Sequence, residues 1–312
     1  MKIHYSRVQC SGKNSETIYF NRMDIQIQND IKYLVIGDPV AHSLSPQMQN
    51  AAFEALGLGR PYAKLQVTTG DFPEFTQFAR ARLSGFNITV PHKKTIIPYL
   101  DSISSEAALA ESVNTVTVKG GRLHGDSTDG FGLAAALADA FQLKVKGGSF
   151  FFIGCGGAVQ AVAFHFAAIG AKNLFFANRS IEKVEELVNK LSSAFPAGHY
   201  EFCGLDNVEK IKLFIGNSEA AIQGTSLGLK PDDPMPIPPE LLKNICVYDT
   251  IYKKTPLLQH AEAAGLKTAD GRTMLLHQGA KSFEIWTGRQ APVEIMRHAL
   301  EQAVIAGSGE KP

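Results

Sequence analysis

Cysteine, long apolar runs and net charge are all scarce in this sequence, and each shortage excludes a class of protein. The four cysteines, Cys10, Cys155, Cys203 and Cys246, lie far apart and form no CxxC pair, which argues against a disulfide framework or a zinc cluster. No stretch of the chain reaches the roughly 18 to 20 apolar residues that span a bilayer. The 31 basic residues offset 30 acidic ones, so no strong field attracts nucleic acid or an anionic membrane.

What remains is the composition of a globular protein. Of the 312 residues, 45% are hydrophobic and 20% are charged, which excludes a disordered chain, and the length favours two domains. The N-terminal segment lacks the continuous apolar core of a secretory signal, so we expect a cytoplasmic protein. The nine histidines form no HExxH motif or paired ligand spacing, and we therefore expect no metal.

Strand and helix patterns alternate along the chain. The first zone predicts strands at 33–37, 62–67, 85–90 and 115–119, with helices at 46–56, 71–81 and 106–109. The second predicts strands at 149–154, 173–178, 219–223 and 245–249, with helices at 156–169 and 181–191. Residues 279–306 are predicted to be largely helical. Such alternation indicates an α/β fold with mainly parallel sheets.

A glycine cluster follows the apolar strand at 149–154. Gly154, Gly156, Gly157 and Ala158 stand between this strand and the next predicted helix. Glycines there permit a tight turn and let phosphate oxygens approach the N–H groups at the positive end of the helix. The cluster alone is equally compatible with a structural turn, but its place between strand and helix favours a dinucleotide site.

The end of the second strand of this zone indicates which dinucleotide binds. NAD-specific sites usually place Asp or Glu there to bind the ribose hydroxyls, whereas this strand ends in Asn178-Arg179-Ser180, followed by Lys183. Arg179 can fork onto a 2′-phosphate, and Ser180 and Lys183 can add donors. The alternative is a solvated helix start in which Arg179 and Lys183 pair with Glu182 or Glu186. We expect NADP rather than NAD.

Further motifs show a resemblance to a known family. They are Gly37-Asp-Pro-Val-Ala-His-Ser43-Leu-Ser45-Pro46, Gly85-Phe-Asn87-Ile-Thr89-Val-Pro91-His-Lys93, Ser112-Val-Asn114-Thr115, Gly125-Asp-Ser127-Thr128-Asp129-Gly130 and Asp270-Gly271 with Gln278-Gly279-Ala280. In this order, and with the glycine cluster, the chain resembles the shikimate/quinate dehydrogenases from about residue 33 to 305. Residues 1–30 have no counterpart that we identify.

The resemblance implies a fold and an activity. It implies a mainly parallel α/β substrate-binding and catalytic domain at 31–130 plus 279–306, with a C-terminal helix returning to it, and a Rossmann-type NADP-binding domain at 131–278. The activity would be reversible NADP-dependent oxidation of shikimate to 3-dehydroshikimate, a step of chorismate and aromatic amino acid biosynthesis. The partner would be a small cyclic hydroxy acid rather than nucleic acid or membrane, and the protein a monomer or homodimer. For residues 1–30, disorder, an edge strand and an oligomer contact stay open.

The resemblance also implies which residues act on the substrate. Oxidation of a secondary alcohol requires removal of the hydroxyl proton as hydride leaves, and the resemblance gives this task to Lys93, paired with Asp129. Ser43 and Ser45, with Tyr252, would hold the substrate carboxylate, since two hydroxyls two residues apart can donate to one carboxylate. Ser45 can instead cap the helix that follows, with Pro46 in its first position.

Three more residues are implied to bind the ring hydroxyls together with Asp129. They are Thr89, Asn114 and Gln278; a turn for Asn114 and a helix cap for Gln278 are the structural alternatives.

Two departures from the family pattern leave the substrate range open. Ser127 stands where Asn is frequent, and the Lys253-Lys254 link after Tyr252 is short. The alternative function is therefore a quinate or dual quinate/shikimate dehydrogenase, with either NADP or NAD as its cofactor. A more distant one is a non-catalytic dinucleotide-binding regulator, against which the joint presence of Lys93 and Asp129 weighs.

Overall fold

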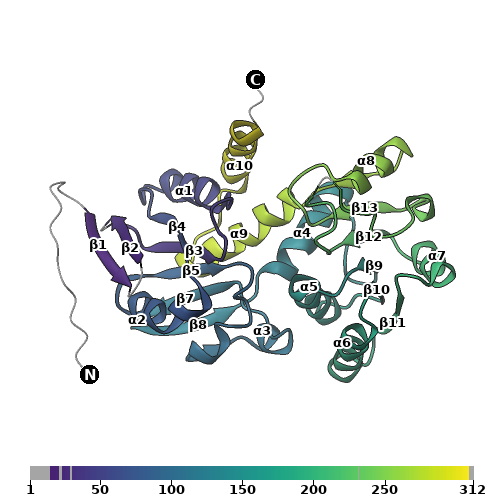
Figure 1. Ribbon diagram of the computed structural model, residues 1–312, viewed down its shortest axis with the longest axis horizontal. Helices are drawn as coiled ribbons and strands as arrows, with labels where there is room; N and C mark the ends of the chain where they lie inside the picture. Colours follow the sequence, from purple (N-terminus) through teal and green to yellow (C-terminus); the bar gives the residue numbers. More distant parts are fainter. Residues whose placement is uncertain (1–14, 21–22, 29, 231, 309–312) are drawn as a thin grey trace. The chain divides into compact units, whose positions relative to one another are not determined.

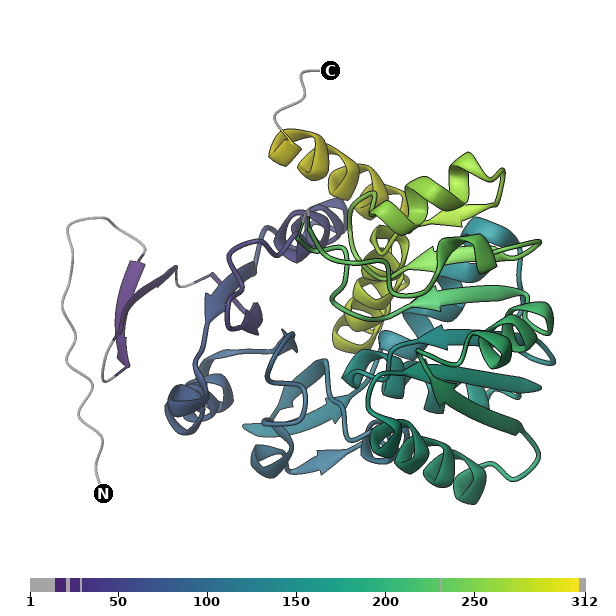
Figure 2. The ribbon, with the colours of Figure 1, turned by 45° about the vertical axis from the view of Figure 1, so that its right-hand side comes forward.

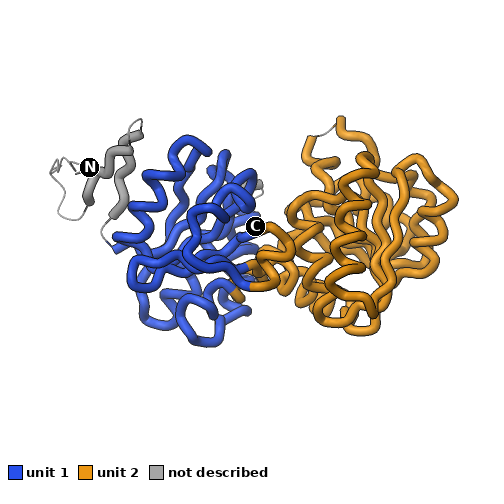
Figure 3. The backbone as a smooth tube through the Cα atoms, turned by 90° about the horizontal axis from the view of Figure 1, so that it is seen from below, with its two compact units in different colours: residues 1–104, 113–126, 282–312 blue, residues 105–112, 127–281 orange. Residues whose placement is uncertain are grey.

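The computed structural model describes residues 15–20, 23–28, 30–230 and 232–308. They fold into two compact units, coloured blue and orange in Figure 3. The first comprises the described residues up to Ser104, together with Val113–Asp126 and those from Ser282 onward; the second comprises Ser105–Ser112 and Ser127–Lys281. Compared with the boundaries expected from the sequence, residues 105–112, 127–130 and 279–281 lie in the second unit.

An N-terminal hairpin precedes the sheet of the first unit. Its strands, β1 (Ser15–Phe20) and β2 (Met23–Gln28), pair antiparallel in a two-stranded sheet of their own. In the described part of the chain neither strand joins a larger sheet, so the edge strand considered for this segment is not formed. Residues 1–14 lie outside the described residues.

The first unit contains a six-stranded mixed sheet in the order β4-β3-β5-β7-β8-β6. Its strands are β3 (Tyr33–Gly37), β4 (Tyr62–Gln66), β5 (Gly85–Ile88), β6 (Ser102–Ile103), β7 (Thr115–Lys119) and β8 (Arg122–Asp126). Only β7 runs antiparallel to its neighbours. A two-residue turn at Gly120 and Gly121, with φ of 59° and 73°, joins β7 to β8. A type I′ turn needs positive φ at both central positions, which glycine adopts readily.

Aromatic side chains fill the core on both faces of this sheet. The helices of the first unit are α1 (Ser45–Ala55), α2 (Phe72–Arg82), the end of α9 (Arg272–Thr287) and α10 (Val293–Ser308). Tyr33 stacks on Phe53 of α1 at 4.8 Å and lies 5.0 Å from Trp286 of α9, whereas Phe86 of β5 meets Phe75 of α2 edge-on at 5.0 Å. Helices α1 and α10, far apart in sequence, lie side by side (Figures 1 and 2).

The first helix begins one residue earlier than predicted. Leu44 occupies the N-cap position of α1, and Ser45 is its first helical residue, with Pro46 second. The prediction that Ser45 caps this helix is therefore wrong. Because Pro46 lacks an N–H, it fits the first turn, where that group would have no partner within the helix. The consequence is that the Ser45 hydroxyl is left for another role.

The second unit is built on a fully parallel sheet in the order β11-β10-β9-β12-β13-β14. Its strands are β9 (Ser149–Ile153), β10 (Asn173–Asn178), β11 (His199–Gly204), β12 (Ala220–Gln223), β13 (Cys246–Asp249) and β14 (Thr268–Ala269). Parallel sheets need cover on both faces, and this one has it. Helices α4 (Asp129–Phe141), α5 (Gly157–Ala168) and α6 (Ile181–Ala194) pack on the face of Phe150, Phe152 and Phe176.

Helices α7 (Val208–Gly216) and α8 (Pro256–Ala263) cover the opposite face, on Phe151 and Phe175. Alternate residues of β9 thus enter opposite cores, which explains its uninterrupted apolar run. The short helix α3 (Ser105–Leu109) also belongs to this unit. The two-unit α/β architecture and the Rossmann-type topology expected from the sequence are both confirmed.

Candidate active site

The predicted substrate residues of the first unit lie at one edge of its sheet. β3 and β5 are parallel neighbours, and β7 runs antiparallel to β5, so the ends of β3 and β5 and the start of β7 share an edge. Ser43 and Ser45 follow β3, Thr89 follows β5, and Asn114 precedes β7. Ligands of open α/β sheets bind at this kind of edge.

The two serines are fixed relative to each other. The amide of Ser45 donates to Ser43 Oγ at 3.3 Å, and the amide of Ser43 donates to the carbonyl of Val40 at 3.0 Å. A hydroxyl that accepts one hydrogen bond can still donate its own hydrogen. Both serines thus retain an O–H to donate to an anion.

Thr89 and Lys93 lie on a chain segment that packs tightly against β3. The amide of Thr89 donates to Ile36 O at 2.9 Å, and a Cβ added to Gly37 would lie 2.5 Å from Thr89 Cγ2. His92 anchors the turn before Lys93, since its buried Nε2 donates to Val67 O at 2.5 Å. Lys93 is half-buried, and its carbonyl accepts from Val113 N at 2.9 Å, which brings it beside Asn114.

A buried network of neutral groups orients Asn114. The Thr115 hydroxyl donates to Asn114 Oδ1 at 3.0 Å and lies 2.8 Å from Ser282 Oγ. Asn87 Nδ2 lies within 3.1 Å of Thr115 Oγ1 and Ser282 Oγ, and Asn87 Oδ1 accepts from the Tyr62 hydroxyl at 2.7 Å. All five residues are less than 9% exposed. Because Asn114 Oδ1 accepts this hydrogen bond from Thr115, the Asn114 side-chain amide is held in one orientation.

The sequence reasoning missed these supporting residues. Asn87 and Ser282 are 195 positions apart, and no local pattern links them. The only signal was the position of Asn87 within the Gly85–Lys93 motif.

In the second unit, Asp129 and Gln278 come together at the start of α4. Asp129 is the first residue of this helix and is 4% exposed. The Thr128 hydroxyl, at the N-cap, donates to Gln278 Oε1 at 3.5 Å, and Gln278 Nε2 donates to Leu275 O at 2.9 Å. A Cβ on Gly132 would lie 2.7 Å from Gln278 Cβ, so α4 and α9 touch here only because Gly132 has no side chain. Gln278 lies within α9 and does not cap it.

Tyr252 follows β13 at the carboxyl edge of the parallel sheet. Although 49% of this residue is exposed, desolvation and then the negative charge of Asp129 raise the pKa of Tyr252 to about 12. The hydroxyl therefore stays protonated at neutral pH and can donate to an anion.

The glycine loop leaves the start of α5 open. Gly154 has a φ of 100°, which favours glycine. Gly156 is the N-cap of α5 with no side-chain cap, and both Gly156 and Gly157 are exposed. A Cβ on Gly157 would meet nothing within 4 Å. The N–H groups of this helix end, with Ala158 half-buried beside them, are therefore accessible to a phosphate.

Arg179 and Lys183 are exposed beside the next strand end. Asn178 Nδ2 donates to Ser180 O at 2.8 Å, which shapes the turn, and Ser180 is the N-cap of α6 without a side-chain cap bond. Among the described residues neither cation forms an ion pair, and Glu186 instead pairs with Lys190 at 2.9 Å. The alternative pairing with Glu182 or Glu186 is thus not formed, and the residues fit a dinucleotide with a 2′-phosphate.

Two further histidines near these motifs have acidic partners. His165 Nδ1 bonds Glu106 at 2.8 Å beside Gly130, and His277 bonds Asp139 at 3.0 Å. The described residues contain no group of three or more His, Cys, Asp or Glu that could hold a metal ion. In the same part of the chain, no helix is long and apolar enough to cross a membrane.

The second unit has a parallel Rossmann-type sheet with an open, glycine-lined helix start. The first unit carries hydroxyls, an amide and a lysine at its strand ends. Together these features are typical of a dinucleotide-dependent dehydrogenase built from two units. Comparison with known proteins narrows this class. Residues 35–116 match the family described as the shikimate dehydrogenase substrate binding domain, 136–226 match shikimate / quinate 5-dehydrogenase, and 271–301 match the shikimate 5'-dehydrogenase C-terminal domain. The chain belongs to the shikimate dehydrogenase family.

Individual relatives cover almost the whole chain. The shikimate dehydrogenase (NADP(+)) of Desulfitobacterium hafniense is 40% identical over 275 residues, 87% of this chain and 98% of the relative. The crystal structure of the Listeria monocytogenes shikimate 5-dehydrogenase with shikimate and NAD has a TM-score of 0.81 at 33% identity, covering 90% of this chain and all of that one. The Thermus thermophilus enzyme with NADP(H) and shikimate has a TM-score of 0.77 at 32% identity, covering 88% and 99%.

Proposed function

We propose that this chain catalyses the reversible oxidation of shikimate to 3-dehydroshikimate with NADP. The observation that carries the proposal is the agreement of both units. One has hydroxyl and amide groups at its strand edge, and the other has an open glycine loop and an Arg179 that forms no ion pair with any described residue. Relatives named shikimate dehydrogenase (NADP(+)) at 40% identity support it.

The cofactor preference rests on Arg179, Ser180 and Lys183. Bound NADP supplies the acceptor for the hydride. The helix start at Gly156–Gly157 would hold the pyrophosphate, and the planar Arg179 guanidinium would hold the 2′-phosphate. No acid stands at the end of β10 to repel that phosphate.

Lys93 and Asp129 would manage the proton. As the carbon–hydrogen bond of the alcohol releases its hydride, the hydroxyl proton passes to the base, and the carbon–oxygen bond becomes a carbonyl. We assign this base to Lys93, with Asp129 as the residue that orients it and stabilises its charged form. In reduction the same group returns the proton to the carbonyl oxygen.

The other polar residues would position the substrate. Ser43, Ser45 and Tyr252 all carry hydroxyls that can donate to its carboxylate. Thr89, Asn114 and Gln278 carry neutral groups suited to a polyol, which offers donors and acceptors together. We further propose a cytoplasmic enzyme, monomeric or homodimeric. Its partners would be small molecules, since a net charge of +1 provides no strong field to attract nucleic acid or an anionic membrane.

Steady-state assays of the purified protein test the proposal. Shikimate and quinate are each tested with NADP and NAD, and the highest kcat/KM is expected for shikimate with NADP. A higher value for quinate or for NAD would replace the proposal with the quinate/shikimate alternative. Binding of NADP without turnover of either acid would indicate a non-catalytic regulator.

A further inference from the structure

The short segment 250–255 between β13 and α8 carries Tyr252, and a single buried carboxylate holds it from both sides. Asp249, the last residue of β13, is fully buried. Its Oδ1 accepts from Ile251 N at 3.0 Å, just before Tyr252, and its Oδ2 accepts from the Thr255 hydroxyl at 2.7 Å, just after it. Both carboxylate oxygens are therefore used on this one segment.

Thr255 connects the carboxylate to the next helix. It is the N-cap residue of α8, and its Oγ1 accepts from Leu258 N at 3.4 Å while donating to Asp249. One hydroxyl thus joins the end of the segment to both β13 and α8. The conformation of residues 250–255 follows from these two elements rather than from its own sequence.

Gly271 packs against the segment next to the Tyr252 ring. Its amide donates to Ile251 O at 3.0 Å. A Cβ there would lie 2.1 Å from Thr250 O and 2.8 Å from Cδ1 of the Tyr252 ring, so the ring rests directly against the glycine backbone.

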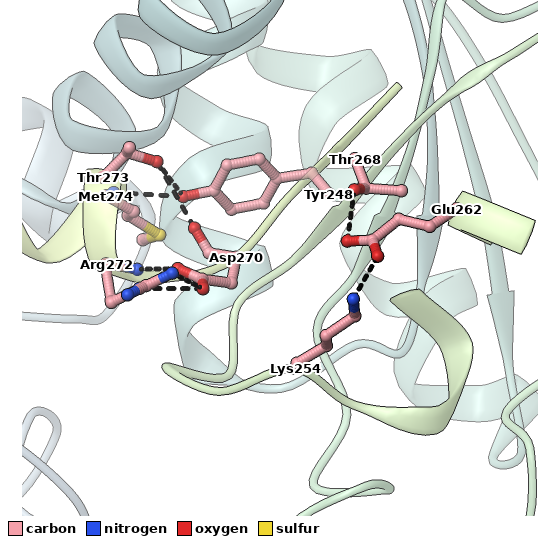
Figure 4. A network of polar contacts seen from close by, with 8 residues as sticks. All are labelled: Tyr248, Lys254, Glu262, Thr268, Asp270, Arg272, Thr273 and Met274. Carbon is pink, nitrogen blue, oxygen red and sulfur yellow. Dashed lines mark hydrogen bonds and ion pairs between the residues drawn. The ribbon is translucent and has the colours of Figure 1, made fainter. Parts of the chain in front are cut away.

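The residues around Gly271 are themselves held by polar contacts, which Figure 4 draws. Arg272 pairs with Asp270 at 2.7 Å, Tyr248 lies 2.9 Å from the Thr273 hydroxyl, and Lys254 pairs with Glu262 of α8. The chain against which Tyr252 packs is therefore tied by side-chain contacts on Asp270 and Tyr248. Tyr252 itself is half exposed, and within the described residues its hydroxyl has no hydrogen-bond partner.

We propose that Asp249 is a positioning residue for substrate binding, which with Thr255 fixes the segment so that the Tyr252 hydroxyl meets the substrate carboxylate. This inference rests on the proposed function, in which Tyr252 binds that carboxylate. Holding a loop with a buried carboxylate costs free energy, because burial disfavours the charged form of the carboxylate. Two charge-assisted hydrogen bonds offset this cost and fix the segment at both ends.

The charges around Asp249 make the arrangement sensitive to protons. Burial, together with the negative charge of Asp270, raises the pKa of Asp249 to about 6. Arg272 offsets Asp270, and Gln223, the register partner of Asp249 on β12, is uncharged. Protonation converts one of the two acceptor oxygens into a donor, so one of the two hydrogen bonds that Asp249 accepts from the segment is weakened or reversed.

The test compares Asp249→Asn, Thr255→Val and Tyr252→Phe in the full chain with shikimate and NADP. Asp249→Asn and Thr255→Val are expected to raise the KM for shikimate about tenfold, the effect of losing roughly one charge-assisted hydrogen bond, and to leave the KM for NADP within twofold. Thr255→Ser, which keeps the hydroxyl, restores the wild-type value. The wild-type KM for shikimate rises as the pH falls through about 6, and Asp249→Asn lacks this additional rise.

The double variant Asp249→Asn/Tyr252→Phe separates the possible failures. If Asp249 acts through Tyr252, its substitution adds nothing in the Tyr252→Phe background. An unchanged KM in Tyr252→Phe alone would overturn the role of Tyr252 in the proposed function. A raised KM in Tyr252→Phe with unchanged values in Asp249→Asn and Thr255→Val would overturn the positioning role alone. An equal rise in the KM for NADP would show a general structural effect instead.

Discussion

The two units hold the side chains that we propose to bind substrate by different physical means. In the first, Asn114 is oriented by neutral groups, Thr115, Asn87 and Ser282, all of them almost fully buried. In the second, Tyr252 is half exposed and lies on a segment held by the buried carboxylate of Asp249. A neutral network has no proton to lose or gain near pH 7, whereas the carboxylate couples the position of Tyr252 to pH.

The difference also predicts opposite effects on stability. Breaking a fully satisfied neutral network leaves buried groups without partners, which is destabilising. Removing a buried charge relieves desolvation, which stabilises the folded state wherever that charge is ionised. The predictions below test this contrast.

The largest expected effect concerns Asp249. Its pKa is raised in the folded state to about 6 from an ordinary value of 3.8, so the folded protein binds the proton more tightly than the unfolded chain. The stability contributed by this group is present below about pH 4 and is lost as the pH rises to about 6. Relative to Asp249→Asn, the wild type should lose on the order of 3 kcal/mol of unfolding free energy across this range.

Denaturant titrations of both proteins between pH 4 and 8 measure that difference. Asp232→Asn, at an exposed acid, is the matched control and should follow the wild type. A gap between wild type and Asp249→Asn that does not change with pH would refute the raised pKa.

The neutral network is tested by Thr115→Val. The substitution keeps the shape but removes the donor to Asn114 and a partner of Asn87 and Ser282, so we expect a loss of about 1 to 3 kcal/mol in unfolding free energy. The KM for shikimate should rise roughly tenfold at every pH, since no titrating group is involved. Thr115→Ser should behave as the wild type in both measurements. An effect of Thr115→Val that changes with pH would contradict the claim that this network, unlike Asp249, contains no titrating group.

Arg179 represents a third situation, an exposed charge of the second unit. Arg179→Ala should raise the KM for NADP by on the order of tenfold, because a bidentate contact to phosphate is lost, and leave the KM for NAD within twofold. Stability should not change, in contrast to both buried sites. Arg60→Ala, which removes another exposed arginine, provides the control, and equal effects on both cofactors would exclude recognition of the 2′-phosphate by Arg179.

Ser127 should show the smallest effect. Its hydroxyl oxygen is buried and has no hydrogen-bond partner among the described residues. Ser127→Ala should therefore leave the unfolding free energy unchanged or raise it by up to about 1 kcal/mol, with the KM for shikimate within twofold. A clear loss of stability in thermal or chemical unfolding would mean that the hydroxyl is satisfied in solution.

The sequence predicted those helices and strands that have a strong local pattern. β9 and α5 follow from an apolar run, a glycine loop and a second apolar run, and their bounds agree with prediction within two residues. Helix α4 was missed, because Gly130 and Gly132 interrupt the pattern at its start. Those glycines are required by contacts with His165 and Gln278, which are more than 30 positions away and invisible to a local pattern.

Motifs predicted the site residues, but they did not predict the residues that support them. Thr115, Ser282 and Asp249 act through partners supplied by the folded sheet, such as the pairing of β5 with β7 and the approach of α9. Helix α1 begins one residue before its predicted start, for a related reason. Whether Leu44 or Ser45 is the N-cap depends on the path of the chain after β3, which the local sequence does not determine.

The central claim is that Lys93 and Asp129 together handle the proton of shikimate, and the kcat for shikimate oxidation with NADP tests it most directly. Lys93→Met and Asp129→Asn should each lower kcat by about 10² to 10⁴ while both ligands still bind, and the double variant should be no slower than the more damaged single variant. Undiminished turnover in Lys93→Met, or losses that multiply in the double variant, would contradict the account.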